Sequence, residues 1–200
     1  FIDSGKSALF ANNSLMKGWL SMPESRELYK KQGIPCWLGE SFLMKENNVF
    51  SFNWRINARS TNQNILISGN DREMNVQALF SILSSITYTI PDGNFSLKII
   101  NPIEEDELIE LGLKNILDAL PNDSFELFDG SSLSEVLNKL NSLMEQRKQS
   151  SDRLPVIIIM PAIEKLVQLQ SSDYGGNALA VQLQLLFSSG STYGIYFICE

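Results

Sequence analysis

The residues from Gly69 to Val76, GNDREMNV, follow an apolar stretch and precede an amphipathic one. A glycine between a buried strand and a helix is the layout of a phosphate-binding loop, in which backbone amides at the positive end of the helix hold the phosphates. That chemistry also needs a second glycine, a lysine for the β and γ phosphates, and a Ser or Thr that binds Mg²⁺. With Gly69 as the first glycine, these three places are taken by Met74, Asn75 and Val76. The loop therefore has the layout of a nucleotide site without its chemistry.

The charges of this loop also oppose phosphate binding. Asp71 and Glu73 bring two carboxylates, and Arg72 offsets only one of them. A carboxylate about 4 Å from a phosphate charge repels it by roughly 4 kcal/mol at a surface-like dielectric. Asn70 is expected to be the N-cap of the following helix, because its side chain can accept a backbone hydrogen bond there. We therefore predict a degenerate nucleotide-binding loop made of Gly69, Asn70, Asp71, Arg72, Glu73, Met74, Asn75 and Val76.

The second half of an ATPase site is vacant as well. ATPases place an acidic residue at the end of a central apolar strand, where it holds Mg²⁺ and aligns water. The strongly apolar stretch LPVIIIM, residues 154–160, ends instead in Pro161 and Ala162. Glu164 is the nearest carboxylate, and we expect it on the solvent side of a following helix. Pro161 and Ala162 are thus predicted to be degenerate positions, and no catalytic residue or metal ligand is predicted in this chain.

Composition excludes several other kinds of site. The chain has no histidine, so it cannot supply a Ser-His-Asp triad, a Cys-His pair or a histidine-bound metal. Cys36 and Cys199 match no metal-binding spacing and are expected to be reduced structural thiols. The tripeptide GKS at residues 5–7 has the letters that end a P-loop, but no helix-forming stretch follows it, which favours a hairpin turn.

Charge and hydropathy limit the partners of the chain. Its net charge is −7 and its basic residues form no cluster, which disfavours direct binding to DNA phosphates. No apolar run reaches the roughly 18 residues of a membrane span, so we expect no direct membrane contact and a cytoplasmic location. The sequence starts without Met and stops within an apolar stretch, and we expect it to be part of a longer protein.

After residue 60 the chain alternates strand-like and helix-like stretches. Strands are expected at 64–68, 96–100, 125–128, 154–160 and 194–199, and helices at 71–87, 104–120, 133–144, after residue 162 and up to about 188. This alternation predicts a three-layer α/β fold, in which a mostly parallel sheet carries helices on both faces and 154–160 lies at its centre. Before residue 60 we expect a hairpin at 1–10, a short helix between an N-cap at Ser21 and a stop at Gly33, and strands from 34 to 54 that lead into the sheet.

Several segments resemble one known family in their order and spacing. They are IPCWLGE at 34–40, NILISG at 64–69, LKIINP at 97–102, FDGSSLSEVLNKLNSLMEQRKQ at 128–149, LPVIIIMPAIEKL at 154–166 and LLFSSGSTYGIYFICE at 185–200. Together they are similar to the motor domain of FtsK/SpoIIIE-type DNA translocases, within the FtsK–HerA group of P-loop ATPases. The resemblance implies a RecA-like, P-loop-type sheet. It also implies that residues 1–32 are the C-terminal tail of a preceding ATPase module, and that 33–200 form a degenerate module truncated at its C-terminus.

The departures from that family shape the functional hypothesis. Positions 74–76 and 161–162 lack the family's nucleotide chemistry, and Gly190-Ser191 stand where the family often has a Gly-Arg turn. The resemblance therefore implies a catalytically inactive ATPase-like module of a larger DNA translocase, acting in assembly, regulation or partner docking. It implies no cofactor in this chain, but ATP and Mg²⁺ in the parent protein, for which it leaves membrane association open. The implied partners are other ATPase modules of the same chain or ring, a protein partner, and DNA bound through the parent.

Two alternatives stay open at this point. A weak ATP-binding motor domain would take its missing cation from a neighbouring subunit, or in cis from Arg55, Arg59 or Arg72. A protein-recognition module of an EssC-like secretion ATPase would instead bind partner peptides in the disused cleft, which would be lined by Met74, Val76 and Pro161.

Overall fold

The computed structural model describes residues 14–22, 30–40, 49–56, 63–91, 93–102, 112–114, 117–118, 125–150, 154–169 and 178–200. Several predicted features lie outside these residues: the hairpin at 1–10 with its GKS turn, Arg59, and most of the helices expected at 21–33 and 104–120. No helix among the described residues is both long and apolar enough to cross a membrane.

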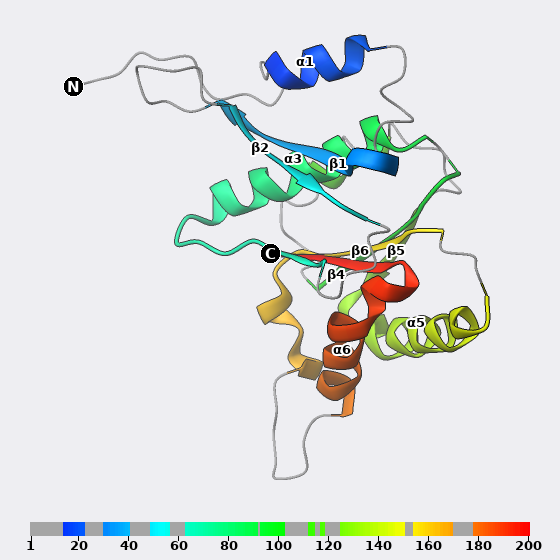
Figure 1. Cartoon of the computed structure of the whole chain (residues 1–200). Coiled ribbons are helices and arrows are strands. Elements are labelled where there is room, and N and C mark those ends of the chain that lie inside the picture. The colour runs from blue at the N-terminus through cyan, green and yellow to red at the C-terminus, as the bar shows by residue number, and fades with distance from the viewer. Residues whose placement is uncertain are drawn as a thin grey trace.

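Five parallel strands form the sheet at the centre of the molecule (Figure 1). Their order across the sheet is β3 (Ile65–Leu66), β7 (Ile195–Cys199), β6 (Val156–Met160), β4 (Ser96–Asn101) and β5 (Phe125–Asp129). The predicted parallel sheet is therefore confirmed, and β6 lies at its centre with all five residues buried, as its composition indicated. Because the strands are parallel, all five carboxyl ends lie at one edge of the sheet.

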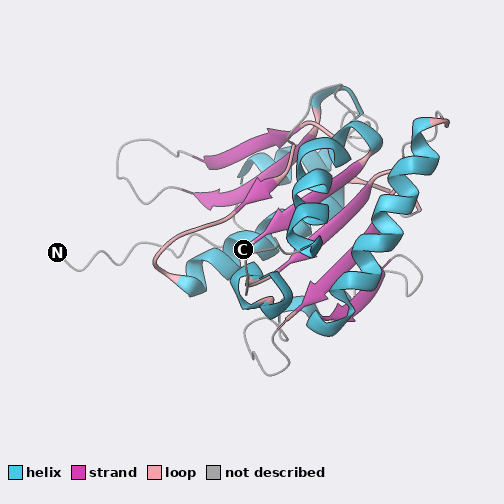
Figure 2. Ribbon diagram, turned by 90° about the horizontal axis from the view of Figure 1, so that it is seen from below, coloured by secondary structure: helices cyan, strands magenta, loops and turns pink. Residues whose placement is uncertain are grey.

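Helices cover both faces of the sheet and complete a three-layer α/β fold (Figures 1 and 2). Helix α3 (Arg72–Thr89) lies on one face, and α5 (Leu133–Lys148) and α6 (Ala178–Ser189) lie on the other. The alternation of β6 shows how one strand serves both layers: Ile157 and Ile159 join the core on the α3 side, while Ile158 joins the core on the α5 and α6 side.

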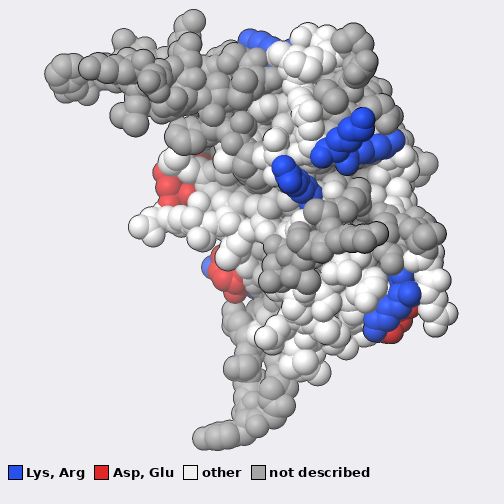
Figure 3. All heavy atoms as spheres, in the orientation of Figure 1, with Lys and Arg blue, Asp and Glu red and all other residues white. Residues whose placement is uncertain are grey.

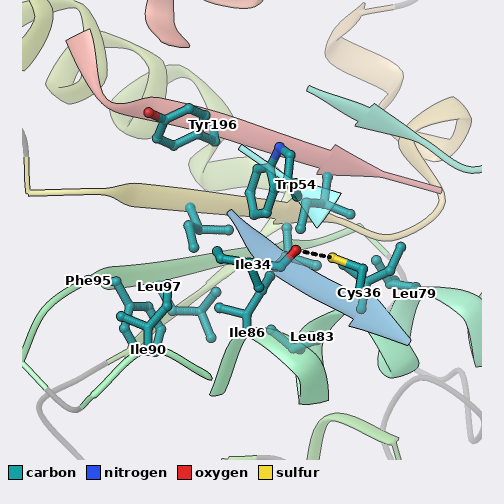
Figure 4. Packing of buried hydrophobic residues seen from close by; sticks show 14 of the residues in the cluster. Ile34, Cys36, Trp54, Leu79, Leu83, Ile86, Ile90, Phe95, Leu97 and Tyr196 are labelled. Atoms are coloured by element: carbon teal, nitrogen blue, oxygen red, sulfur yellow. Dashed lines mark hydrogen bonds between the residues drawn. The ribbon is translucent and has the colours of Figure 1, made fainter. Parts of the chain in front are cut away.

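An antiparallel hairpin shares the α3 face of the sheet. It consists of β1 (Ile34–Glu40) and β2 (Val49–Trp54), which pair only with each other among the described strands. The prediction that residues 34–54 lead into the main sheet is therefore wrong: Ile34, Cys36 and Trp54 instead pack in the core beside α3 (Figure 4). Trp54 joins the two layers, because its ring meets Tyr196 of β7 edge to face at 5.5 Å and its Nε1 donates to the Gln63 carbonyl at 2.7 Å.

Gly33 and Ser21, near the hairpin, were predicted to be a helix stop and a helix N-cap. Gly33 follows a helical segment at residues 30–32 and has φ +90°, as expected of a helix stop. A Cβ at Gly33 would also lie 2.8 Å from the Trp54 carbonyl oxygen, so only glycine fits there. Ser21, predicted to be an N-cap, is instead the last residue of α1 (Ser14–Ser21), and its hydroxyl donates to the Gly18 carbonyl at 2.7 Å.

Short 3-10 turns link the remaining elements. They are η2 (Gly130–Ser132), η3 (Ile163–Lys165), η4 (Val167–Leu169) and η5 (Gly190–Tyr193). The helix predicted after residue 162 is thus two 3-10 turns, and Glu164 is exposed on the first of them, as expected. The strand predicted at 64–68 is only two residues long; it lies at the edge of the sheet and pairs with β7 alone among the described strands.

Candidate functional site at the carboxyl edge of the sheet

The loop after β3 and the turn after β6 lie at the same edge of the sheet, one on each side of β7. Glu200, directly after β7, is hydrogen-bonded to the turn after β6. Its amide donates to the Met160 carbonyl at 3.1 Å and its carbonyl accepts from the Ile163 amide at 2.8 Å. Its carboxylate Oε2 accepts from the Ala162 amide at 3.0 Å. The structure therefore places the two predicted halves of the site at one edge, with an acidic residue that the sequence analysis missed between them.

The positive end of α3 is capped by a carboxylate from within the loop. Asp71 has an extended backbone, and its Oδ1 accepts a hydrogen bond from the Met74 amide at 3.1 Å. The prediction that Asn70 is the N-cap is thus wrong by one residue, because the helix starts at Arg72 and the capping side chain must come immediately before it. The amide that could have faced a phosphate is already bonded to a carboxylate.

Asn75 fills the space next to Gly69. Its Nδ2 donates to the Gly69 carbonyl at 3.2 Å, and its backbone amide donates to the Asp71 carbonyl at 3.1 Å. A Cβ built on Gly69 would lie 2.7 Å from Asn75 Oδ1. A larger residue at Gly69 would therefore displace the end of the Asn75 side chain from this position.

The predicted loop residues divide by exposure. Residues 69–74 are all exposed, and Met74 keeps 66% of its surface in contact with solvent. Val76 is buried in the core on the α3 side, and Pro161 and Ala162 are buried as well. A cleft lined jointly by Met74, Val76 and Pro161 is therefore not formed, because two of the three side chains belong to the interior.

The turn after β6 has an unusual backbone. Ala162 has φ 52° and ψ 52°, the left-handed conformation that non-glycine residues rarely adopt. Its amide points at the Glu200 carboxylate, so the chain reverses there with its donor satisfied. The position where an ATPase would hold Mg²⁺ is thus a closed turn whose neighbouring carboxylate is engaged by the backbone.

Arg72 and Arg55, proposed to assist nucleotide binding, and the Gly190-Ser191 turn lie in different parts of the fold. Arg72 is the first residue of α3 and is exposed. The Cγ of Arg55 lies 3.0 Å from the position of a Cβ at Gly33, at the open end of the hairpin. Gly190 and Ser191 lie in η5, directly before the amino end of β7 and hence at the opposite edge of the sheet. Only Arg72 belongs to the loop that would face a nucleotide.

Two thiols and one carboxylate in the described part of the chain have clearly shifted pKa values that bear on reactivity. Burial raises the pKa of the Cys36 and Cys199 thiols to about 12, which makes both of them poor nucleophiles. Hydrogen bonds from Ser131 and Ser132 lower the pKa of Asp129, at the end of β5, where its carboxylate caps η2. Among the described residues no group of three or more acidic, Cys or His side chains could hold a metal ion.

Comparison with known proteins adds no relative: a scan against models of protein families and a search among curated proteins both found no match for this chain. The fold and the edge together define a three-layer α/β domain with a parallel sheet, in which a strand-loop-helix occupies the place of an anion site and is capped by its own side chains.

Proposed function

We propose that this chain is a catalytically inactive ATPase-like module of a larger FtsK/SpoIIIE-type translocase, with a role in assembly, regulation or partner docking. In this proposal residues 33–200 form the module and 1–32 end the preceding one. ATP and Mg²⁺ belong to other modules of the parent, which also contacts DNA. The observation that carries the proposal is the capped end of α3, where Asp71 accepts the Met74 amide at 3.1 Å.

A triphosphate placed on this loop would meet two carboxylates and would find no lysine. The loop supplies the carboxylates of Asp71 and Glu73, and Asn75 Nδ2 is turned inward to the Gly69 carbonyl. Glu73 itself accepts from Gln77 Nε2 at 3.1 Å, one helical turn further on. At roughly 4 kcal/mol of repulsion for each close carboxylate, a single arginine cannot restore binding.

The second half of the site supports the same conclusion. In an active ATPase the residue after the central strand supplies a carboxylate for Mg²⁺. Here Pro161 and Ala162 occupy that turn, and the Glu200 carboxylate from the next strand accepts the Ala162 amide at 3.0 Å. Two independent requirements of nucleotide hydrolysis are thus unmet at one edge of one sheet.

The fold supports the proposed ancestry. The segments that resemble the family contain the expected strands, β1 and β3 to β7, and α5 and α6, while 3-10 turns replace the helix expected after β6. Strand-loop-helix units joined in a parallel sheet are shared by many folds, so the family assignment depends on the sequence resemblance, and the inactivity depends on the loop geometry.

Nucleotide-dependent thermal unfolding tests the proposal. The chain is unfolded with and without 5 mM ATP and Mg²⁺, with an intact P-loop ATPase as positive control. Micromolar affinity at millimolar ligand would stabilise the fold by about 4 kcal/mol and raise the melting temperature by several degrees. We expect no shift for this chain. A clear upward shift would overturn the proposal.

The variants Asp71→Asn and Arg72→Ala make this experiment sharper. Asparagine caps a helix about as well as aspartate does, so Asp71→Asn removes the charge and keeps the cap. We expect neither variant to gain a shift, because the lysine and the Mg²⁺ ligand are still missing. An ATP-dependent shift of the parent chain that Arg72→Ala abolishes would favour the alternative of a weak ATP-binding motor.

A further inference from the structure

A groove opens beside β3, on the face of the sheet that α6 covers. Its volume is about 330 Å³, roughly twice that of an engineered apolar cavity of about 150 Å³ that admits benzene. The groove therefore has room for two apolar side chains. Its walls include Leu66 of β3, Cys199 of β7, Ile163 of η3, and Gln184, Phe187 and Ser188 of α6.

The strand and the helix that form walls of this groove both expose large apolar side chains. Leu66 keeps 72% of its surface in solvent, Val181 61% and Leu185 48%. Val181 and Leu185 are four residues apart and lie on one face of α6, next to Gln184 in the groove wall. Large apolar side chains exposed together, and not singly, mark surfaces that bind another chain.

The backbone of β3 determines the kind of chain that fits. Ile65 pairs with Ile198 and Leu66 with Cys199 in parallel register, and the Ile67 amide donates to the Cys199 carbonyl at 2.8 Å. In a parallel pair with this register, Ile65 and Ile67 direct their backbone groups to β7, and Leu66 directs its own away from it. No hydrogen bond of the Leu66 amide or carbonyl is seen within the described part of the chain. An edge of this kind is completed by an extended strand.

The charges near the groove indicate which residues suit the ends of that strand. Acidic side chains lie above and below an uncharged strip at the left edge of Figure 3. Asp71 and Glu73 follow β3 in the sequence, Glu164 follows Ile163 of the groove wall, and Glu200 follows Cys199. Arg72 and Lys165 are the cations adjacent to these positions in the sequence, so four negative charges are offset by two positive ones. This side of the molecule is acidic, which complements basic residues on a ligand.

We propose that the edge of β3 that no described strand covers, together with the groove beside it, binds an extended segment of a partner protein, with apolar side chains at alternate positions and Lys or Arg at its ends. The segment adds a strand at Leu66, its alternate side chains enter the groove, and its basic ends lie near the acidic residues of the rim. Asp71 and Glu73 take part only as charges of the rim, so the interaction does not depend on whether their loop binds nucleotide.

A synthetic peptide, KKVTVTVKK, is a direct probe of this surface. Its binding to the 200-residue chain is measured by fluorescence polarisation, beside two control peptides. EEVTVTVEE reverses the charge of the ends, and KKVTPTVKK removes the central amide and cannot form a regular strand. We expect saturable binding of the first peptide and at least about tenfold weaker binding of each control.

Matched protein variants locate the binding surface. Leu66→Asp adds a carboxylate at the exposed edge of β3 and is expected to weaken KKVTVTVKK binding by about tenfold or more. Leu127→Asp makes the same change at another exposed leucine, on β5 at the opposite edge of the sheet, and is expected to leave binding unchanged. Hydrogen exchange supplies a second readout: the peptide should slow exchange of the Leu66 amide, while that of Ile67, already bonded to Cys199, changes little.

Four results of the binding experiments would overturn the proposal. They are the absence of KKVTVTVKK binding up to about 1 mM, equal binding by Leu66→Asp and Leu127→Asp, equal binding of the proline peptide, and equal binding of the acidic peptide. Self-association of the chain that Leu66→Asp abolishes, measured by light scattering, would assign the groove to a second copy and would also overturn it.

Discussion

The central strand β6 and the edge strand β3 are both apolar and both precede a loop at the carboxyl edge, yet the structure treats them differently. All five residues of β6 are buried, and the strand pairs with β7 on one side and β4 on the other. β3 pairs only with β7 among the described strands, and its Leu66 is 72% exposed. Apolar composition made both segments strands, but the strand order decided which of them became core.

The amino ends of the two strands are also held differently. Arg147 of α5 is buried, and its guanidinium donates to the carbonyls of Tyr193, Gly194 and Leu154, which precede the two central strands β7 and β6. At β3 the neutral side chain of Asn64 has this role: it donates to the Phe187 carbonyl at 2.8 Å and accepts from the Phe197 amide at 3.0 Å. A charged guanidinium thus binds the amino ends of β6 and β7, and a neutral side-chain amide binds at the amino end of β3.

The largest expected effect is a difference between two truncations. Ile158→Ala removes a fully buried side chain from the centre of β6 and should lower the free energy of unfolding by about 3 kcal/mol. Leu66→Ala should change it by less than about 0.5 kcal/mol, because the side chain is exposed. Urea unfolding of both variants measures the difference. Equal losses would mean that β3 is covered in solution and would break the comparison.

Removing the two amino-end contacts should give a smaller contrast. Arg147→Met keeps most of the apolar stem and removes the charged hydrogen bonds to the Tyr193, Gly194 and Leu154 carbonyls, of which that of Gly194 still accepts from the Val156 amide at 2.8 Å. We expect a loss of about 3 kcal/mol. Asn64→Ala removes two neutral hydrogen bonds and should cost about 1 to 2 kcal/mol. Arg147→Lys is the matched control and should fall between Arg147→Met and the parent chain in urea unfolding. A loss of under about 1 kcal/mol for Arg147→Met would show that the central strands do not need the guanidinium.

The smallest effect concerns the turn that ends β6. Ala162→Gly relieves a left-handed conformation worth about 1 kcal/mol and gives up a buried methyl group worth about 0.8 kcal/mol, so stability should stay within about 0.5 kcal/mol of the parent. Ala180→Gly, in α6, has no strain to relieve and should cost about 1 kcal/mol. Thermal unfolding of the pair measures this difference. If Ala162→Gly loses as much as Ala180→Gly, the backbone at Ala162 is not strained.

The main features of the fold were predictable because they depend on local patterns. The alternation of strand-like and helix-like stretches after residue 60 led to a parallel sheet with two helical layers, and the five consecutive apolar residues of β6 indicated its central place. The strands at 34–54 were wrongly assigned to the main sheet, because β1 and β2 have the same apolar character as its strands and their partner choice depends on contacts with α3 and Tyr196.

The sequence was sufficient to show which nucleotide-binding side chains are missing from the candidate site. Residue types alone show that positions 74–76 and 161–162 carry no lysine, hydroxyl or carboxylate. Residue types could not show that Asp71, and not Asn70, is the N-cap, since this depends on the residue at which the helix begins. Nor could they bring Glu200 to Ala162, because residues 38 positions apart in the chain meet there only through the pairing of β6 with β7.

By itself the sequence determined which segments become strands and helices and which chemistry is missing, because periodicity and side-chain type are local properties. Tertiary structure decided which apolar strand is covered and which is left at an edge, and which polar groups satisfy one another at the ends of the strands. These outcomes depend on the order of strands in the sheet, a property of the whole chain in which distant segments compete for the same backbone hydrogen bonds.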